Sequence, residues 1–147
     1  MSKIVIADEL KLRRGYVTLI KGGEGGGEED AEKENLITDS GNIILGKATA
    51  GIVELDGNVD ISLGINDAAP TPGDTVITSP FATRTATMEY DEIGNSLVFT
   101  AEFFGTWTGD VKEAGLIHQT EGMISRVNIT FSKSFDEIYT IKWTITV

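Results

Sequence analysis

Carboxylates spaced like the ligands of a calcium loop are the first groups in this chain that could do chemistry. Asp56 and Asp60 are followed by Asp67, eleven residues after Asp56, which matches the opening and closing positions of such a loop. The position that must be glycine in a calcium loop is filled by Ile61, however, and the residues from Asn58 onward alternate like a strand. We therefore expect a charged turn followed by a strand, and we predict no metal site.

Groups suited to acid–base or nucleophilic catalysis are equally sparse. His118 is the single histidine and cysteine is absent, so neither a histidine pair for a metal nor a histidine-dependent triad can be assembled. His118 follows Leu116 and Ile117 in a polar loop, and we expect its side chain on the surface. The 23 acidic residues offer many carboxylate pairs for glycoside hydrolysis, but nothing in the sequence selects one pair. We predict no catalytic, cofactor-binding or metal-binding residues, and hence a protein that is not an enzyme.

A glycine-rich stretch at residues 21–35 invites comparison with a phosphate-binding loop. It contains five glycines and six acidic residues. A phosphate loop needs a Lys-Ser/Thr pair, which is missing here, and Glu24, Glu28 and Glu29 would repel an anion. Because the stretch has no large apolar side chain to bury, we predict a mobile acidic loop.

Length and composition narrow the class of protein further. The 147 residues suit one domain spanning residues 1–147. A net charge of −11 would repel phosphates, so we predict no nucleic-acid partner. No apolar run approaches the roughly 18 residues that span a bilayer, and the first residues lack a signal peptide's apolar core, so we predict no membrane partner. The absence of cysteine fits assembly in a reducing cytoplasm.

Period-two alternation is the strongest structural signal, and it lies at the end of the chain. Residues 139–147 alternate between polar side chains and Tyr139, Ile141, Trp143, Ile145 and Val147, which predicts a strand with one buried face. We expect this strand to be locked into a sheet and central to the core. Residues 123–132 repeat the pattern, with Arg126 on the polar face and Val127, Ile129 and Phe131 on the apolar one.

The remaining elements complete a fold dominated by strands. Thr38, Asp39 or Ser40 can cap a short helix that runs through Ala48, with Ile43, Ile44 and Lys47 packing one face. The proline-containing loop at 66–75 should be ordered but irregular. Further strands are expected at residues 4–20 (one long strand or a pair), 58–65, 82–89 and 97–107. The predicted class is mainly β: a β-sandwich or small barrel of six to eight strands with one short helix and the mobile acidic loop.

Phe104 is an aromatic side chain for which a surface role must be considered. It points away from Phe103 and shares its face of the predicted strand with Val98. Such a second apolar face is usually covered by a helix, and otherwise by another subunit. We expect the helix at residues 41–48 to cover it.

Five short blocks carry a family resemblance through their order and spacing. They are NLITDSGN at 35–42, NDAAPTPGDT at 66–75, EAGL at 113–116, MISR at 123–126 and WTIT at 143–146. Together they resemble a group of small tailed-bacteriophage virion structural proteins. The match covers most of the chain from Asn35 onward and is loose before it; no single block is diagnostic. Members of the group look like capsid decoration proteins or tail-associated components.

The resemblance implies a non-enzymatic virion protein that is assembled in the host bacterial cytoplasm. The function expected first is that of a capsid decoration (cement) protein, which binds the major capsid protein or other virion proteins as a homotrimer and stabilises the head. A tail, neck or fibre-base component is the alternative within the virion. A carbohydrate- or cell-surface-binding β-module is the alternative from another class, with Tyr90, Trp107 and Tyr139 as the ligand-facing side chains.

Overall fold

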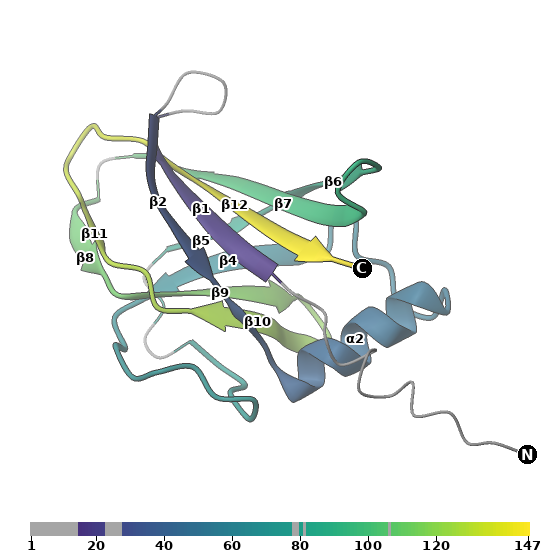
Figure 1. Cartoon of the computed structure of the whole chain (residues 1–147). Helices are drawn as coiled ribbons and strands as arrows, with labels where there is room; N and C mark the ends of the chain where they lie inside the picture. The colour runs from purple at the N-terminus through teal and green to yellow at the C-terminus, as the bar shows by residue number, and fades with distance from the viewer. Residues whose placement is uncertain (1–14, 23–27, 78–79, 81, 106) are drawn as a thin grey trace, which may run out of the picture.

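The computed structural model describes residues 15–22, 28–77, 80, 82–105 and 107–147. Two antiparallel five-stranded sheets face each other as a β-sandwich, with a two-stranded sheet at one end and a helix at the other (Figure 1). The predicted fold class is confirmed. The described residues form twelve strands rather than six to eight, because two predicted segments are each divided and four further strands lie where none was expected.

The first sheet is built around the strand that the alternation at residues 139–147 predicts. Its strands follow the order β2 (Glu28–Glu34), β1 (Gly15–Lys21), β12 (Tyr139–Thr146), β7 (Ser96–Phe103) and β6 (Thr87–Asp91). Trp143 of the central β12 lies between Val17 of β1 and Phe99 of β7. Its indole is completely buried, as are Ile141 and Ile145, so the predicted inward face is confirmed along β12. Val147, which is expected on the same face, is 46% exposed.

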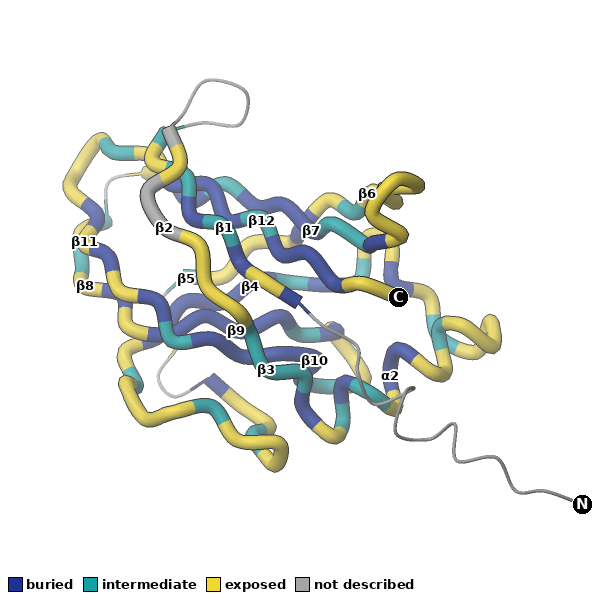
Figure 2. The backbone as a smooth tube through the Cα atoms, viewed as in Figure 1, coloured by how far each residue is buried: buried dark blue, intermediate teal, exposed yellow. Residues whose placement is uncertain are grey.

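The second sheet supplies the opposing layer of the core. Its strands follow the order β3 (Leu36–Ile37), β10 (Gly122–Val127), β9 (Glu113–His118), β4 (Val59–Gly64) and β5 (Ala82–Thr85). The third sheet consists of β8 (Gly109–Val111) and β11 (Phe131–Lys133). Residues 82–89 and 123–132 are therefore each split between two strands in different sheets. The division of residues 82–89 lies at Ala86, whose N–H donates to Val59 O (2.9 Å). Side chains from both large sheets form one buried apolar cluster. In Figure 2, which colours the backbone by burial, dark blue marks buried residues along strands of both large sheets.

The acidic segment 21–35 is largely not the loop that its composition predicts. Glu28–Glu34 forms β2 at the edge of the first sheet, paired with β1 from Tyr16–Glu34 to Lys21–Glu28. Main-chain hydrogen bonding to β1 orders this strand, and composition alone does not reveal such pairing. An acidic edge strand also deters pairing with the sheets of other chains. Residues 23–27, and residues 4–14 of the strand predicted at 4–20, lie outside the described part.

Helix α2 (Asp39–Thr49) begins at the predicted cap and packs against the second sheet. Thr38 Oγ1 accepts from Gly41 N (3.0 Å) and donates to Met123 O (3.0 Å). A Cβ on Gly41 would overlap the carbonyl of Ile124, so only glycine permits this close approach to β10. The buried helix face carries Ile44 and Leu45, whereas Ile43 is exposed, contrary to the predicted face.

The prediction that this helix covers Phe104 is wrong. The helix packs against β10, while Phe104 follows β7 in the other sheet and remains half-exposed. Its ring lies under the guanidinium of Arg84, 5.0 Å from the ring centroid. Within the described residues, no helix has the length and apolar character needed to cross a membrane.

The turn before β12 contains an ion pair that makes a pH-dependent contribution to stability. Glu137 accepts from Lys21 Nζ (2.9 Å) and from Ser134 N (2.8 Å), and these bonds lower the carboxyl pKa from 4.5 to about 2. Because the folded state holds the lower pKa, this stabilisation is present above pH 4.5 and is lost as the pH falls towards 2. Carboxyl NMR titration should show the low midpoint, and Lys21→Met should move it back towards 4.5. A wild-type midpoint near 4.5 would contradict the ion pair.

Candidate functional site

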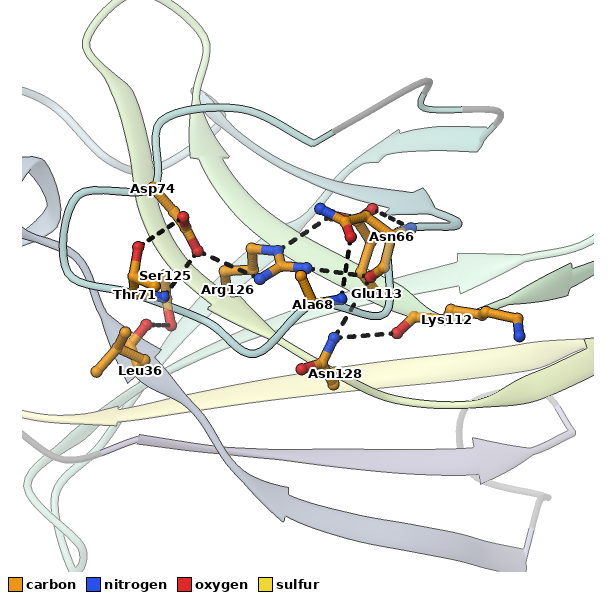
Figure 3. A network of polar contacts seen from close by, with 10 residues as sticks. All are labelled: Leu36, Asn66, Ala68, Thr71, Asp74, Lys112, Glu113, Ser125, Arg126 and Asn128. Atoms are coloured by element: carbon orange, nitrogen blue, oxygen red, sulfur yellow. Dashed lines mark hydrogen bonds and ion pairs between the residues drawn. The ribbon is translucent and has the colours of Figure 1, made fainter.

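A buried arginine organises the outer face of the second sheet. Arg126 is only 2% exposed, and its guanidinium reaches three partners. Nε donates to Glu113 Oε1 (3.1 Å), Nη1 to Asp74 Oδ2 (3.2 Å) and Nη2 to Asn66 O (3.1 Å), as Figure 3 shows. Asn66 and Asp74 belong to the loop at residues 65–77, which follows β4. The assignment of Arg126 to a solvent-facing side of its strand is therefore wrong.

The carboxylates of the network hold the 65–77 loop at both of its ends. Glu113 is fully buried and accepts from Asn66 N (2.5 Å) through its second oxygen. Asp74 accepts from Thr71 N (2.9 Å) and Thr71 Oγ1 (2.8 Å). These bonds from Thr71, aided by the Arg126 guanidinium, hold the pKa of Asp74 below its ordinary value. The loop is irregular but ordered, as predicted.

Apolar packing and the helix start fix the same loop from two further sides. Ile77 is buried at the position where Gly64 and Gly115 present no side chain, and a Cβ on either glycine would overlap it. Asp39 N, at the first residue of α2, donates to Pro72 O (2.8 Å). The loop therefore folds back against the second sheet. It contacts Gly115 of β9 through Ile77 and Arg126 of β10 through Asn66 and Asp74, and these two sheet residues are paired with each other.

The five sequence blocks on which the family resemblance rests meet around this network. Glu113 of EAGL, Arg126 of MISR, and Asn66 and Asp74 of the 66–75 block form its centre. The 35–42 block joins through Ser125 Oγ, which donates to Leu36 O (2.7 Å). Asn35 of the same block reaches WTIT: its side-chain nitrogen donates to Gly15 O, and its side-chain oxygen accepts from the indole Nε1 of Trp143. Residues far apart in sequence thus form one connected unit.

No protein-family model, no curated protein and no solved structure matches this chain. Functional inference therefore depends on the arrangement of its own residues. The most distinctive arrangement is the fixed loop, because a buried ion pair is costly to desolvate and needs good geometry to be tolerated. At the two ends of this loop Ile65 and Val76 are 52% and 67% exposed. The loop thus presents apolar side chains on a rigid support, and we treat it as the candidate interaction surface.

His118 and Lys133 are two further buried ionisable residues, and both bind the main chain. His118 Nε2 contacts Glu54 O (2.9 Å), while Nδ1 accepts from Thr120 N and Glu121 N (both 3.2 Å). Nε2 must therefore carry the proton and donate. The expected surface position of His118 is wrong: at 5% exposure it caps the turn after β9.

Lys133 holds the segment after β7 in place. Its ammonium donates to Gly105 O (2.8 Å), Trp107 O (3.0 Å) and Ser134 O (3.1 Å), and it lies 4.6 Å from the Trp107 ring centroid. Sequence alternation does not identify Arg126, because it lies at a polar position of its strand. Lys133 lies two residues after Phe131 and so continues the buried face, which is a signal that a single charged residue hides. Glu113 carried one usable signal, since it begins an otherwise small and apolar run, EAGLI.

Among the carboxylates with the spacing of a calcium loop, Asp60 has other partners. Asp60 accepts from Thr85 Oγ1 (2.9 Å) and Gln119 Nε2 (2.9 Å), and Asp67 lies exposed in the 65–77 loop. In the described part of the chain, no group of three or more histidine, aspartate or glutamate side chains is placed to hold a metal ion.

The three aromatic side chains considered for sugar binding do not form a platform. Tyr139 is 4% exposed and packs on Phe131, with ring centroids 4.6 Å apart, so it cannot face a ligand. Trp107 is half-buried beside Lys133, and Tyr90 lies on β6, where its hydroxyl donates to Asn95 Oδ1 (2.6 Å). This placement gives the carbohydrate-binding alternative no specific support.

Proposed function

We propose that this chain is a non-enzymatic structural protein of a tailed-bacteriophage virion. In the form we favour, it is a capsid decoration protein that binds the major capsid protein as a homotrimer and stabilises the head. Its mechanism is interfacial burial, in which repeated symmetric contacts bridge neighbouring capsid subunits. A tail, neck or fibre-base position is the second candidate, because the sequence resemblance includes tail-associated components.

The fixed 65–77 loop is the observation that carries this proposal. Binding costs free energy wherever a loop must be ordered, and a loop already fixed by Arg126 avoids that cost. Ile65 and Val76 offer apolar area to a partner, and their loop neighbours Asn66, Asp67 and Thr75 are polar, as residues at the rim of protein interfaces are. Binding residues are commonly placed on loops that a rigid scaffold positions.

The use of the buried charges supports a structural role. Glu113 and Arg126 bind each other and the loop, while His118 and Lys133 bind main-chain groups. Each of these side chains therefore already serves to hold the fold together. A catalytic group, by contrast, must be able to reach a substrate atom.

Light scattering and particle reconstitution test the proposal. We expect the purified protein to have three times the mass of the 15.8 kDa chain and to add to capsids stripped of decoration. Electron microscopy of the particles should then show it on the head; density at the tail, neck or fibre base would favour the second candidate. A strict monomer that adds neither to heads nor to tails would contradict a virion role.

Val76→Asp should remove particle binding without unfolding the protein. Val76 is exposed, so its loss should change the free energy of unfolding by no more than about 0.5 kcal/mol. A charge in an apolar contact should weaken particle affinity by tenfold or more. Ile93→Asp is the matched control, because Ile93 is fully exposed in the turn between β6 and β7, away from the loop. Equal binding by both variants would show that the 65–77 loop is not the interface.

A further inference from the structure

A polar pocket lies at the edge of the sandwich, where β5 of the second sheet meets β7 of the first. Its volume is about 270 Å³, and the residues that line it include Arg84, Thr85, Thr87, Thr100, Glu102 and Phe104. Among the described residues, neither the 65–77 loop nor the aromatic residues Tyr90, Trp107 and Tyr139 contribute to this lining. The pocket is therefore separate from the candidate interaction surface and from the side chains considered above for sugar binding.

The change of sheet between β5 and β6 creates this pocket. β12 pairs with β7 as far as Phe103, whereas β6 pairs with it only as far as Thr100. The last residues of β7 therefore extend beyond β6, and Arg84 of β5 reaches this part of the strand. Thr100 and Glu102 lie on the outer face of β7, because the residues that alternate with them are buried in the core.

The guanidinium of Arg84 is held in place but still has donors to offer. Nη2 donates to Phe104 O (3.4 Å), and Cζ lies 5.0 Å from the centroid of the Phe104 ring in a cation–π contact. A guanidinium has several N–H groups, and in the described part of the chain the others have no partner. A ligand that accepts from them meets a group that is already ordered, so less conformational entropy is lost on binding.

The pocket also offers hydrogen-bond acceptors. Thr87 Oγ1 donates to Thr100 O (3.4 Å) and keeps its lone pairs, while the Thr100 hydroxyl has no hydrogen-bond partner among the described residues. Glu102 adds a carboxylate to the lining. The formal charges of Arg84 and Glu102 cancel, so the pocket is neutral as a whole and can both donate and accept.

These groups argue against three classes of ligand and favour a fourth. An anion would meet Glu102 in a chain of net charge −11, and a cation would meet Arg84. An apolar molecule would take both charges out of water without replacing their hydrogen bonds. A neutral ligand with several hydroxyl groups satisfies both charges, because each hydroxyl can donate and accept.

Phe104 narrows the class to sugars. It remains 50% exposed beside the Arg84 guanidinium, so an apolar surface borders the polar groups. A pyranose ring carries hydroxyl groups around its edge and C–H groups on its faces, and it can contact both kinds of surface at once. Sites for drug-sized ligands begin at about 300 Å³, so the pocket suits a smaller ligand, such as one sugar residue.

We propose that this pocket binds one residue of a neutral saccharide. Arg84 donates to the hydroxyl oxygens of the sugar, Thr87 and Glu102 accept from its hydroxyl groups, and a C–H face lies against Phe104. The site is independent of the virion role proposed above, because it uses other residues.

NMR titration of the full chain tests the proposal with glucose, galactose, mannose and N-acetylglucosamine as probes. At least one of these sugars should shift the amide signals of Arg84, Thr87 and Phe104 saturably. A ligand of this size makes few contacts, so we expect a Kd in the millimolar range. Saturable shifts of the same signals by sodium acetate would show an anion site and overturn the proposal. The absence of saturable shifts with every sugar, or shifts confined to other residues, would also overturn it.

Methyl glycosides of the same sugars distinguish the two sources of such a ligand. Their anomeric oxygen is blocked, as it is within a glycan chain. Undiminished binding of a methyl glycoside would support a sugar residue of a glycan as the ligand, whereas binding of the free sugar alone would support a monosaccharide.

Two substitutions with matched controls test the assigned residues. Arg84→Met should weaken sugar affinity by about tenfold or more, because it removes the charged donors. Lys112→Met, which also removes one exposed positive charge, should leave the affinity unchanged. Phe104→Ala should weaken binding as well, and Phe135→Ala, at another exposed phenylalanine, should not. The dispersion of the remaining spectrum reports whether each variant is folded; unchanged affinity in the folded Arg84→Met and Phe104→Ala proteins would overturn the proposal.

Discussion

Trp143→Ala should lower the free energy of unfolding by about 3–5 kcal/mol, the range measured for large aromatic truncations in protein cores. Trp143 is completely buried at the centre of β12, between Val17 and Phe99 on the neighbouring strands. The substitution leaves a cavity that such well-paired strands can only partly fill. It also removes the indole N–H that donates to the half-buried Asn35 amide, whose oxygen then keeps the Ser125 hydroxyl as a donor. A domain of this size has roughly 5–15 kcal/mol of stability in total, so the loss is a large share of it.

Urea unfolding followed by far-ultraviolet circular dichroism measures this loss without depending on tryptophan fluorescence. Trp143→Phe is the informative control, because it keeps a buried ring but removes the indole N–H. It should cost less than the alanine variant, and the difference separates packing from the Asn35 hydrogen bond. If the alanine variant loses less than about 1 kcal/mol, Trp143 does not lie in the core.

The elements that sequence predicts correctly are those whose signal is local. Alternation at residues 139–147 follows from the two-residue period of a strand, and the core face of β12 is the one that it marks. The start of α2 follows from a hydroxyl at Thr38 that can accept from an N–H three residues later. Each of these inferences needs only a few neighbouring residues, so long-range folding does not alter it.

The features that sequence misses are produced by contacts between distant segments. Arg126 occupies a polar position of an alternating strand, and it becomes buried because the 65–77 loop folds over that face. The same effect buries Glu113, thirteen residues earlier in the chain. β2 is missed for a related reason, since its pairing with β1 uses main-chain groups that composition does not report.

The burial of this ion pair predicts a second large effect. Arg126→Met should lower the free energy of unfolding by about 3–5 kcal/mol, because it leaves the Glu113 carboxylate buried without its cation. Glu113 is 0% exposed, and among the described residues only the Asn66 N–H would still donate to its carboxylate. Asn66 O and Asp74 would lose their bonds from the guanidinium at the same time. Hydrogen exchange should therefore show earlier opening of the Asn66 amide than of the β12 amides.

A double-mutant cycle distinguishes the cost of an unpaired charge from that of lost packing. Arg126→Met combined with Glu113→Gln should be more stable than Arg126→Met alone, since no buried charge then remains unpaired. Lys47→Met is the matched surface control: its 3.1 Å pair with Glu121 is exposed, and its loss should cost at most about 1 kcal/mol. If the double variant were less stable than Arg126→Met, the guanidinium would act mainly through packing and main-chain contacts. In that case the loop would be held by Asn66 O and Ile77 rather than by the ion pair, and Val76 would still be presented on a fixed support.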